Sequence, residues 1–99
     1  MTALHTPRAA PSSTREELDR HLREEAGDPR WWSNAPADTY AWHDHPYHKV
    51  LYCAEGTIVF HTRDGDVALR AGDRLDLPPG TEHAATVGAA GVTCVEAWR

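Results

Sequence analysis

From residue 39 onward, short β-prone segments alternate with turns rich in glycine and proline, and this alternation most constrains the fold. Asp64-Gly65 is a typical hairpin turn, and Pro78-Pro79-Gly80 interrupts backbone pairing. The expected strands share β-branched or aromatic residues and span residues 39–43, 49–54, 57–62, 67–69, 74–77, 83–87 and 92–98. Short strands at regular spacing are typical of an all-β sandwich or barrel.

The N-terminal part of the chain has a different pattern. Residues 1–12 are rich in Pro, Ala and Thr without an apolar period, so we expect a disordered or loosely attached tail. A short α-helix is predicted over residues 13–27, because Ser13–Glu16 has the pattern of a capping box. Leu18 and Leu22 give that helix a thin apolar stripe, which must pack on another surface.

The remaining residues, 30–99, are predicted to form the β-barrel. Trp31 and Trp32 stand before its first expected strand, and we expect them to contact the helix or a second subunit. Cys53 and Cys94 lie in apolar segments. With no export signal in view they are expected to be reduced, although a disulfide between them stays open.

Composition excludes several classes of function. The 99 residues suffice for one domain, and the net charge of −5 provides no basic footprint for nucleic acid. No apolar run approaches the roughly 18 residues of a membrane span, and the N-terminus lacks the apolar core of a secretory signal. A cytoplasmic protein without nucleic-acid or membrane partners is therefore expected. Because a chain this short has a modest core, a homodimer is also expected.

Three of the seven histidines, His43, His45 and His48, fall within six positions. Side chains at i and i+2 of a strand share a face, so His43 and His45 can present two imidazoles to one ion. The best candidate for a third ligand is His83, which follows a rigid turn and begins a strand. Imidazole suits first-row transition ions. The pattern predicts one divalent ion, with Fe, Mn, Ni, Zn and Cu all open.

These segments resemble the two motifs of the cupin superfamily, in particular its small single-domain, cupin-2-like members. The matching positions are His43, His45 and Gly56 in the first motif, and Gly72, Pro78, Gly80 and His83 in the second. The resemblance implies a single double-stranded β-helix, or jelly-roll barrel, preceded here by one short helix. It also implies a metal on His43, His45 and His83, and frequent dimers.

Lys49 stands where the cupin pattern has a glutamate ligand, and Val87 stands where it has an asparagine. A divalent ion and an ammonium about 6 Å apart repel by roughly 5 kcal/mol at an effective dielectric of about 20. Lys49 could turn away or be neutral, an anion could bridge the two cations, or the site could hold no metal. Alternatively, a bulge at Pro46 could turn His48 inward as a substitute fourth ligand.

The function expected from this pattern is that of a small soluble metal-binding cupin. It would be an enzyme that polarises or oxidises a small organic molecule, with an anionic one as an option, at a three- or four-histidine centre. In one alternative, the same pocket binds a ligand without turnover and Lys49 is a fixed cation that contacts substrate or anion. In another, the protein is a metal-free structural dimer.

Overall fold

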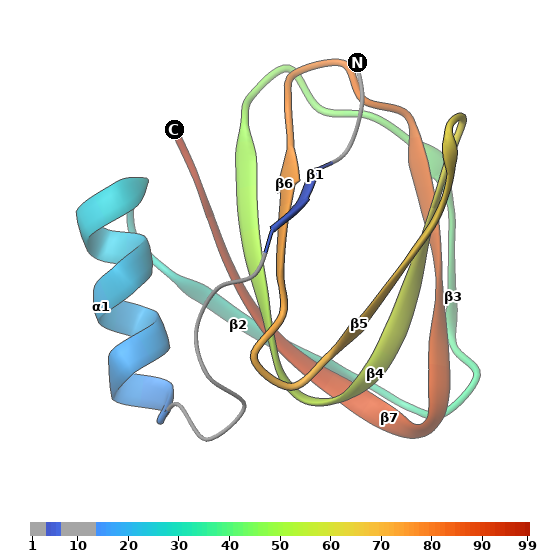
Figure 1. The fold of residues 1–99 in the computed structure, drawn as a ribbon, viewed down its shortest axis with the longest axis horizontal. Helices are drawn as coiled ribbons and strands as arrows, with labels where there is room; N and C mark the ends of the chain where they lie inside the picture. The colour runs from blue at the N-terminus through green and yellow to red at the C-terminus, as the bar shows by residue number, and fades with distance from the viewer. Residues whose placement is uncertain (1–3, 7–13) are drawn as a thin grey trace.

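The computed structural model describes residues 4–6 and 14–99, which form one helix and seven strands (Figure 1). The elements are β1 (Leu4–Thr6), α1 (Arg15–Glu25), β2 (Arg30–Asn34), β3 (Thr39–His43), β4 (Lys49–Thr62), β5 (Gly65–Arg70), β6 (Arg74–Leu77) and β7 (His83–Trp98). The strands pair antiparallel in the order β1-β6-β4-β7-β2, with β3 also on β7 and β5 also on β4. This sheet curls around an interior, which confirms the all-β prediction.

Two long strands replace four of the predicted short ones. β4 runs through the turn expected at Glu55-Gly56, and β7 runs through the residues between the last two expected strands. Both strands continue because the chain bends at register shifts on either side of Gly56. Gly56 has a positive φ of 75°, and a Cβ there would lie 2.0 Å from the carbonyl oxygen of Gly91. Only glycine fits this bend.

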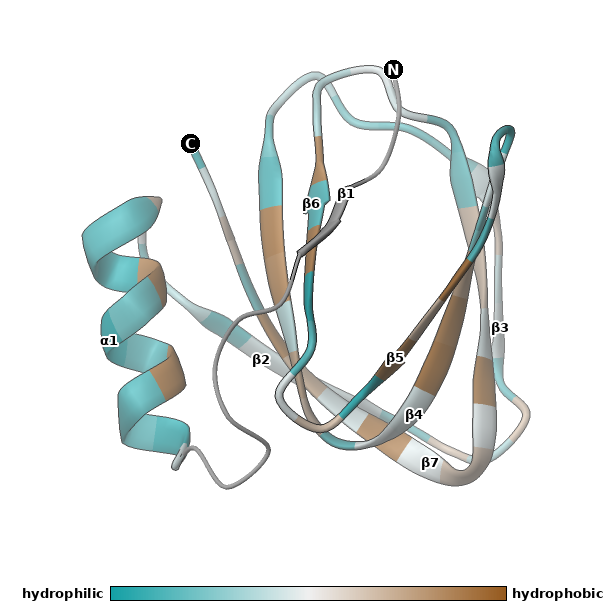
Figure 2. Cartoon of the chain, in the orientation of Figure 1, coloured by the Kyte–Doolittle hydropathy of each residue, from teal (hydrophilic) through white to brown (hydrophobic). Residues whose placement is uncertain are grey.

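The side chains of β4 and β7 alternate between two apolar clusters. The inner cluster fills the barrel and contains Leu51, Cys53, Ile58, Phe60, Leu69, Leu75, Leu77, Ala85, Val87, Val92 and Cys94. The outer cluster lies between the sheet and α1 and contains Leu18, Leu22, Val50, Tyr52, Val95 and Ala97. Figure 2 shows the apolar residues of α1 on the side that faces the barrel. Period-two alternation thus gives each long strand two buried faces.

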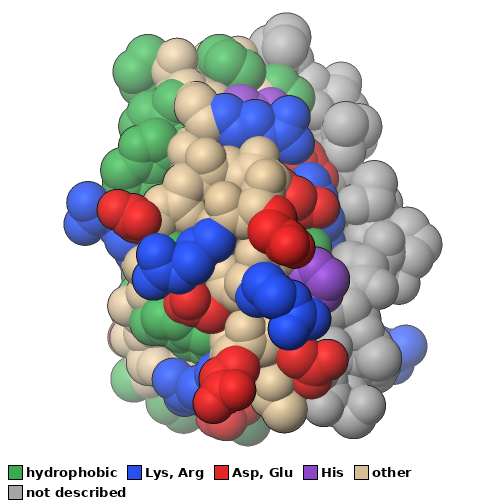
Figure 3. Space-filling view, turned by 90° about the vertical axis from the view of Figure 1, so that its left-hand side faces the viewer, with side chains coloured by type: hydrophobic (Ala, Val, Ile, Leu, Met, Phe, Trp, Pro, Cys, Tyr) green, Lys and Arg blue, Asp and Glu red, His purple; other side chains and the backbone are tan. Residues whose placement is uncertain are grey.

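Helix α1 is capped one residue later than predicted. The capping box joins Thr14 and Glu17, each of which receives a hydrogen bond from the other's backbone N–H. The tryptophan pair divides between the clusters: Trp31 packs on the outer cluster and Trp32 on the inner one. Trp31 therefore contacts the helix side, as expected, and its Nε1 donates to Asp19 at 3.3 Å. On the face where α1 lies, acidic and basic side chains are interspersed (Figure 3).

Two expectations about the chain as a whole can be compared with the structure. Cys53 and Cys94 face each other in the β4–β7 register, and both are buried free thiols.

Part of the tail predicted over 1–12 is a strand, since residues 4–6 form β1 and pair with β6. The rest of that tail lies outside the described residues. Within 4–6 and 14–99, no helix is long and apolar enough to cross a membrane.

Candidate metal centre

Three histidines from separate parts of the chain meet at one end of the barrel. His43 ends β3 and lies opposite His83, the first residue of β7, in the strand register. The loop that carries His45 is tied to the turn before His83, because the backbone N–H of Gly80 donates to the carbonyl oxygen of His45 at 2.8 Å. One potential ligand atom from each of the three histidines lies within 4.8 Å of the others. The structure therefore brings together the three residues that the motifs single out.

Hydrogen bonds orient each imidazole of the cluster. The Nδ1 atoms of His43 and His83 lie 2.7 and 2.8 Å from the carbonyl oxygens of Ala41 and Thr81. A carbonyl oxygen can only accept, so both Nδ1 atoms carry the proton, and in the neutral rings both Nε2 atoms keep a lone pair. Backbone carbonyls that fix the tautomer in this way are typical partners of metal-binding histidines.

His45 reaches the same tautomer through side chains. Its Nε2 lies 3.3 Å from Nζ of Lys49, and its Nδ1 lies 3.3 Å from the hydroxyl of Tyr47. The ammonium can only donate, so Nε2 of His45 is the acceptor and Nδ1 carries the proton. All three histidines therefore present an unprotonated Nε2, the form that binds a cation.

Burial favours the neutral form of two of the three imidazoles. It lowers the pKa of His45 to about 4, and the charge of Lys49 acts in the same direction. Burial also lowers the pKa of His83, which is almost completely inaccessible to solvent. At neutral pH these two imidazoles are therefore uncharged without any metal, and an incoming ion displaces no proton from them.

Lys49 points towards the histidines and is paired with an acid that the sequence analysis missed. Its Nζ lies 3.2 Å from Oε2 of Glu96, and the two side chains are 11% and 14% exposed. The other carboxylate oxygen of Glu96 accepts from Nε1 of Trp32 at 2.9 Å. The sequence signal that could have identified Glu96 as an inward-facing residue is the period-two alternation in β7, which places it on the same face as Cys94. Lys49 is therefore not an unpaired cation.

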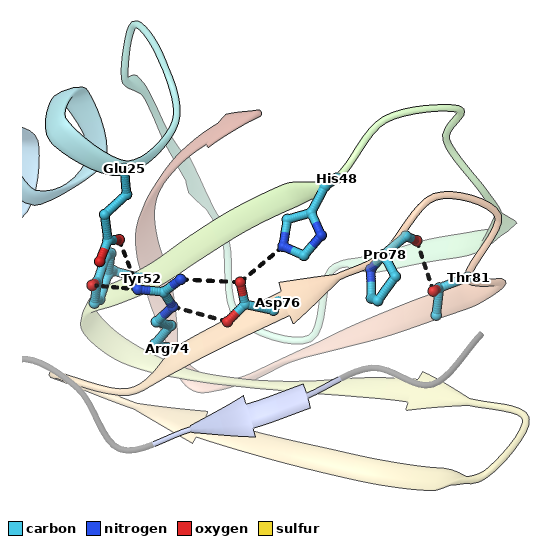
Figure 4. Close-up of polar contacts among 7 residues, drawn as sticks. All are labelled: Glu25, His48, Tyr52, Arg74, Asp76, Pro78 and Thr81. Atoms are coloured by element: carbon cyan, nitrogen blue, oxygen red, sulfur yellow. Dashed lines mark hydrogen bonds and ion pairs between the residues drawn. The ribbon is translucent and has the colours of Figure 1, made fainter. Parts of the chain in front are cut away.

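The proposal of His48 as a fourth ligand is contradicted by its position. Its Nε2 lies 2.9 Å from Oδ1 of Asp76, on the outer face of the sheet (Figure 4). Arg74 donates to both oxygens of Asp76 and also reaches Glu25 and Tyr52. The bend at Pro46 and Tyr47 does not turn His48 inward: His48 immediately precedes β4, and its side chain points away from the barrel interior.

A cavity of about 250 Å³ adjoins the cluster. Its lining combines aromatic, apolar and charged residues: Trp32, Tyr40, His43, Lys49, Leu51, Phe60, His83, Ala85 and Glu96. Most of this wall is apolar, and its polar groups converge on the histidine end. Such a cavity accepts a small organic molecule and orients it by a few polar contacts.

Comparison with known structures shows that the fold is shared with cupins. A cupin-2 domain containing protein from Shewanella frigidimarina is 23% identical over 73% of this chain and 70% of its own, with a TM-score of 0.62. A DUF861 family protein from Thermotoga maritima is 17% identical over 99% of this chain and 100% of its own, with a TM-score of 0.68. The DMSP lyase DddQ from Ruegeria pomeroyi is 20% identical over 73% of this chain and 37% of its own, with a TM-score of 0.68.

The comparison with curated protein sequences finds no match. The family model of the AraC-like ligand binding domain matches residues 33–94, which include all three clustered histidines, Lys49 and most of the barrel. Together with the structural neighbours, this match confirms the double-stranded β-helix that the two motifs imply. The chain therefore has the cupin fold and is a member of the AraC-like ligand binding domain family.

Proposed function

We propose that this protein binds one divalent transition ion on His43, His45 and His83 and acts on a small organic molecule held beside it. The observation that carries the proposal is that one potential ligand nitrogen from each of the three histidines lies within 4.8 Å of the others, and that each ring is oriented by a hydrogen bond. An ion bound there supplies Lewis-acid polarisation of a substrate oxygen.

The protein's own residues set what can bind next to the ion. The imidazoles of His45 and His83 are neutral, and Lys49 and Glu96 cancel each other's charge, so the ion's charge is not compensated by its surroundings. An anionic molecule with two oxygens that can chelate the ion is therefore the favoured ligand. Phe60 and Trp32 offer the apolar wall that shields it from water.

The first test is metal content and metal uptake. Protein purified without a histidine tag or chelator is expected to carry about one transition ion per chain, or to take up about one from added Fe²⁺, Mn²⁺, Ni²⁺ or Zn²⁺. His83→Ala should abolish this binding. His61→Ala is the matched control, since His61 bonds Asp66 and Thr86 outside the cluster. Less than about a tenth of an ion per chain, with no uptake, contradicts the proposal.

A second candidate is a ligand-binding module without turnover. The family match supports it, because the matching domain is described as ligand binding and not as catalytic. The two candidates differ in how they respond to small carboxylic acids. A binding module is stabilised against heat by a particular acid and returns it unchanged, whereas an enzyme converts it only when loaded with metal. Mass spectrometry of the recovered ligand distinguishes them.

A further inference from the structure

Lys49 has two partners in the wall of the cavity. Its Nζ lies 3.3 Å from Nε2 of His45 and 3.2 Å from Oε2 of Glu96, so the ammonium is shared between an imidazole and a carboxylate. Both members of the ion pair are nearly buried. A charge this far from water depends on its partners, so neither contact can be lost without a replacement.

The contact with His45 conflicts with metal binding. Nε2 of His45 has a single lone pair in the plane of the ring, which can accept from the ammonium or bind an ion, but not both. A divalent ion at the histidines would also repel the ammonium of Lys49. Lys49 thus occupies a ligand direction of the cluster, and it must leave His45 before an ion can bind there.

Glu96 offers the place to which Lys49 can withdraw. In the β4–β7 register Glu96 lies opposite Leu51, two residues along β4 from Lys49 on the same face. Nε1 of Trp32 holds Oε1 of Glu96, which leaves Oε2 directed at the lysine. Lys49 can therefore give up His45 and keep its carboxylate partner with only a change of its own side-chain torsions.

We infer that Glu96 is a positioning residue for the metal site: it is the counter-ion that draws Lys49 away from His45 when an ion enters. This inference rests on the proposed metal binding and deepens it. It explains how a lysine can stand where the cupin pattern has a glutamate. The compensating carboxylate lies on the last strand, and without it Lys49 acts as an internal cation that competes with the metal.

The test is a Co²⁺ titration followed by calorimetry and by visible absorption, which reports the ligands around the ion independently of any activity. Glu96→Gln is expected to weaken Co²⁺ binding by about tenfold or more, because Lys49 loses its carboxylate and stays on His45. Adding Lys49→Met to that variant should restore binding to the wild-type level or beyond, since the competing cation is then absent. Glu55→Gln, which removes a charge from an exposed position, should change the affinity by less than about twofold.

Trp32→Phe keeps both charges and removes only the hydrogen bond that holds Glu96. It should weaken Co²⁺ binding in the same direction by about threefold, which provides a test if Glu96→Gln does not fold. The inference is overturned if Glu96→Gln binds like wild type. It is also overturned if Lys49→Met fails to restore binding to the Glu96→Gln variant, since Glu96 would then be a direct ligand or a purely structural support.

The pattern of binding also separates this inference from the proposed function. If the wild type takes up no Co²⁺ but the double variant of Lys49 and Glu96 does, Lys49 blocks the site even with Glu96 present, and both the proposed metal binding and the inference fail. If the wild type binds and the variants of Glu96 and Lys49 match it, the inference fails alone. If no variant binds, both are overturned.

Discussion

His45 and His48 lie three residues apart in the same stretch of chain, yet the fold places them in opposite surroundings. His45 points into the barrel, towards two other histidines and a lysine, and its pKa is lowered to about 4. His48 points to the outer face, where its partner is the carboxylate of Asp76 at 2.9 Å. The inner face therefore gathers the clustered histidines and the Lys49–Glu96 pair beside a cavity, and the outer face gathers charges that pair with one another.

The difference shows that proximity in sequence is a poor guide to shared chemistry. The chain bends at Pro46 and Tyr47, between the end of β3 and the start of β4, so the nearest histidine to the pair is excluded while His83, far along the chain, is included. The two faces of the sheet also differ in the contacts that their side chains make. The polar contacts around Arg74 on the outer face, here called the outer network, link α1 to the barrel through Arg74 and Glu25. The three clustered histidines on the inner face make no such link. We therefore expect outer-face changes to affect stability and inner-face changes to affect binding.

Asp76→Ala should have the largest effect on stability. It removes the acceptor of Arg74 and His48, and Arg74, whose side chain is 15% exposed, would be left nearly buried with a reduced set of partners. Breaking a buried pair on one side costs about 3–5 kcal/mol, and we expect about 3 because Glu25 and Tyr52 still contact Arg74. Urea unfolding followed by circular dichroism measures this loss.

The matched control is Asp66→Ala, since Asp66 also pairs with a histidine of β4 but is 62% exposed. Its removal should cost less than about 0.5 kcal/mol. Metal affinity should be the same in both variants. If Asp76→Ala costs less than about 1 kcal/mol, or if it alters metal affinity, the division of roles between the two faces is wrong.

Acid should destabilise the metal-free protein in two successive ranges. His45 has its pKa lowered from 6.5 to about 4, so between these values the unfolded chain binds a proton that the folded chain does not. Stability therefore falls as the pH drops through this range, and His83 contributes in the same direction. Burial alone would raise the pKa of Asp76, but hydrogen bonds from Arg74 and His48 outweigh it and lower that pKa. Its contribution is present above its ordinary value of 3.8 and is lost as the pH falls below it.

Denaturant unfolding at a series of pH values in the presence of chelator separates the two ranges. His45→Gln should flatten the fall in the upper range, where Lys49, His43 and His83 are the charged or titratable neighbours that disfavour its protonation. Asp76→Asn should flatten the fall in the lower range. A His45→Gln profile parallel to that of the wild type in the upper range would contradict the lowered pKa of this residue.

Local pattern was sufficient to predict the histidine site but not its surroundings. The H-x-H pair and the turn before His83 are encoded within short segments, so the meeting of the three histidines could be predicted before the structure was known, whereas metal binding by them stays a prediction. Glu96 could not, because its position beside Lys49 depends on the register between β4 and β7, which is set by long-range pairing. β2 was missed for a related reason. Its adjacent residues Trp31 and Trp32 pack on different clusters, so both faces of the strand are apolar and its sequence shows no alternation of apolar and polar residues.

Glu25→Gln should have the smallest effect and tests how far the outer network extends. Glu25 is the last residue of α1, and its Oε2 lies 2.7 Å from Nη1 of Arg74, but its side chain is 38% exposed. Water screens such a pair, so we expect a loss of about 0.5 kcal/mol that shrinks further in high salt. Glu24→Gln, one position earlier on the same exposed helix surface, controls for the change in net charge. A loss above about 1.5 kcal/mol that persists in salt would show that the helix depends on this ion pair. The expected small loss would instead mean that Leu18 and Leu22 hold α1 on the barrel, and that the strength of each outer contact follows its burial and not its distance.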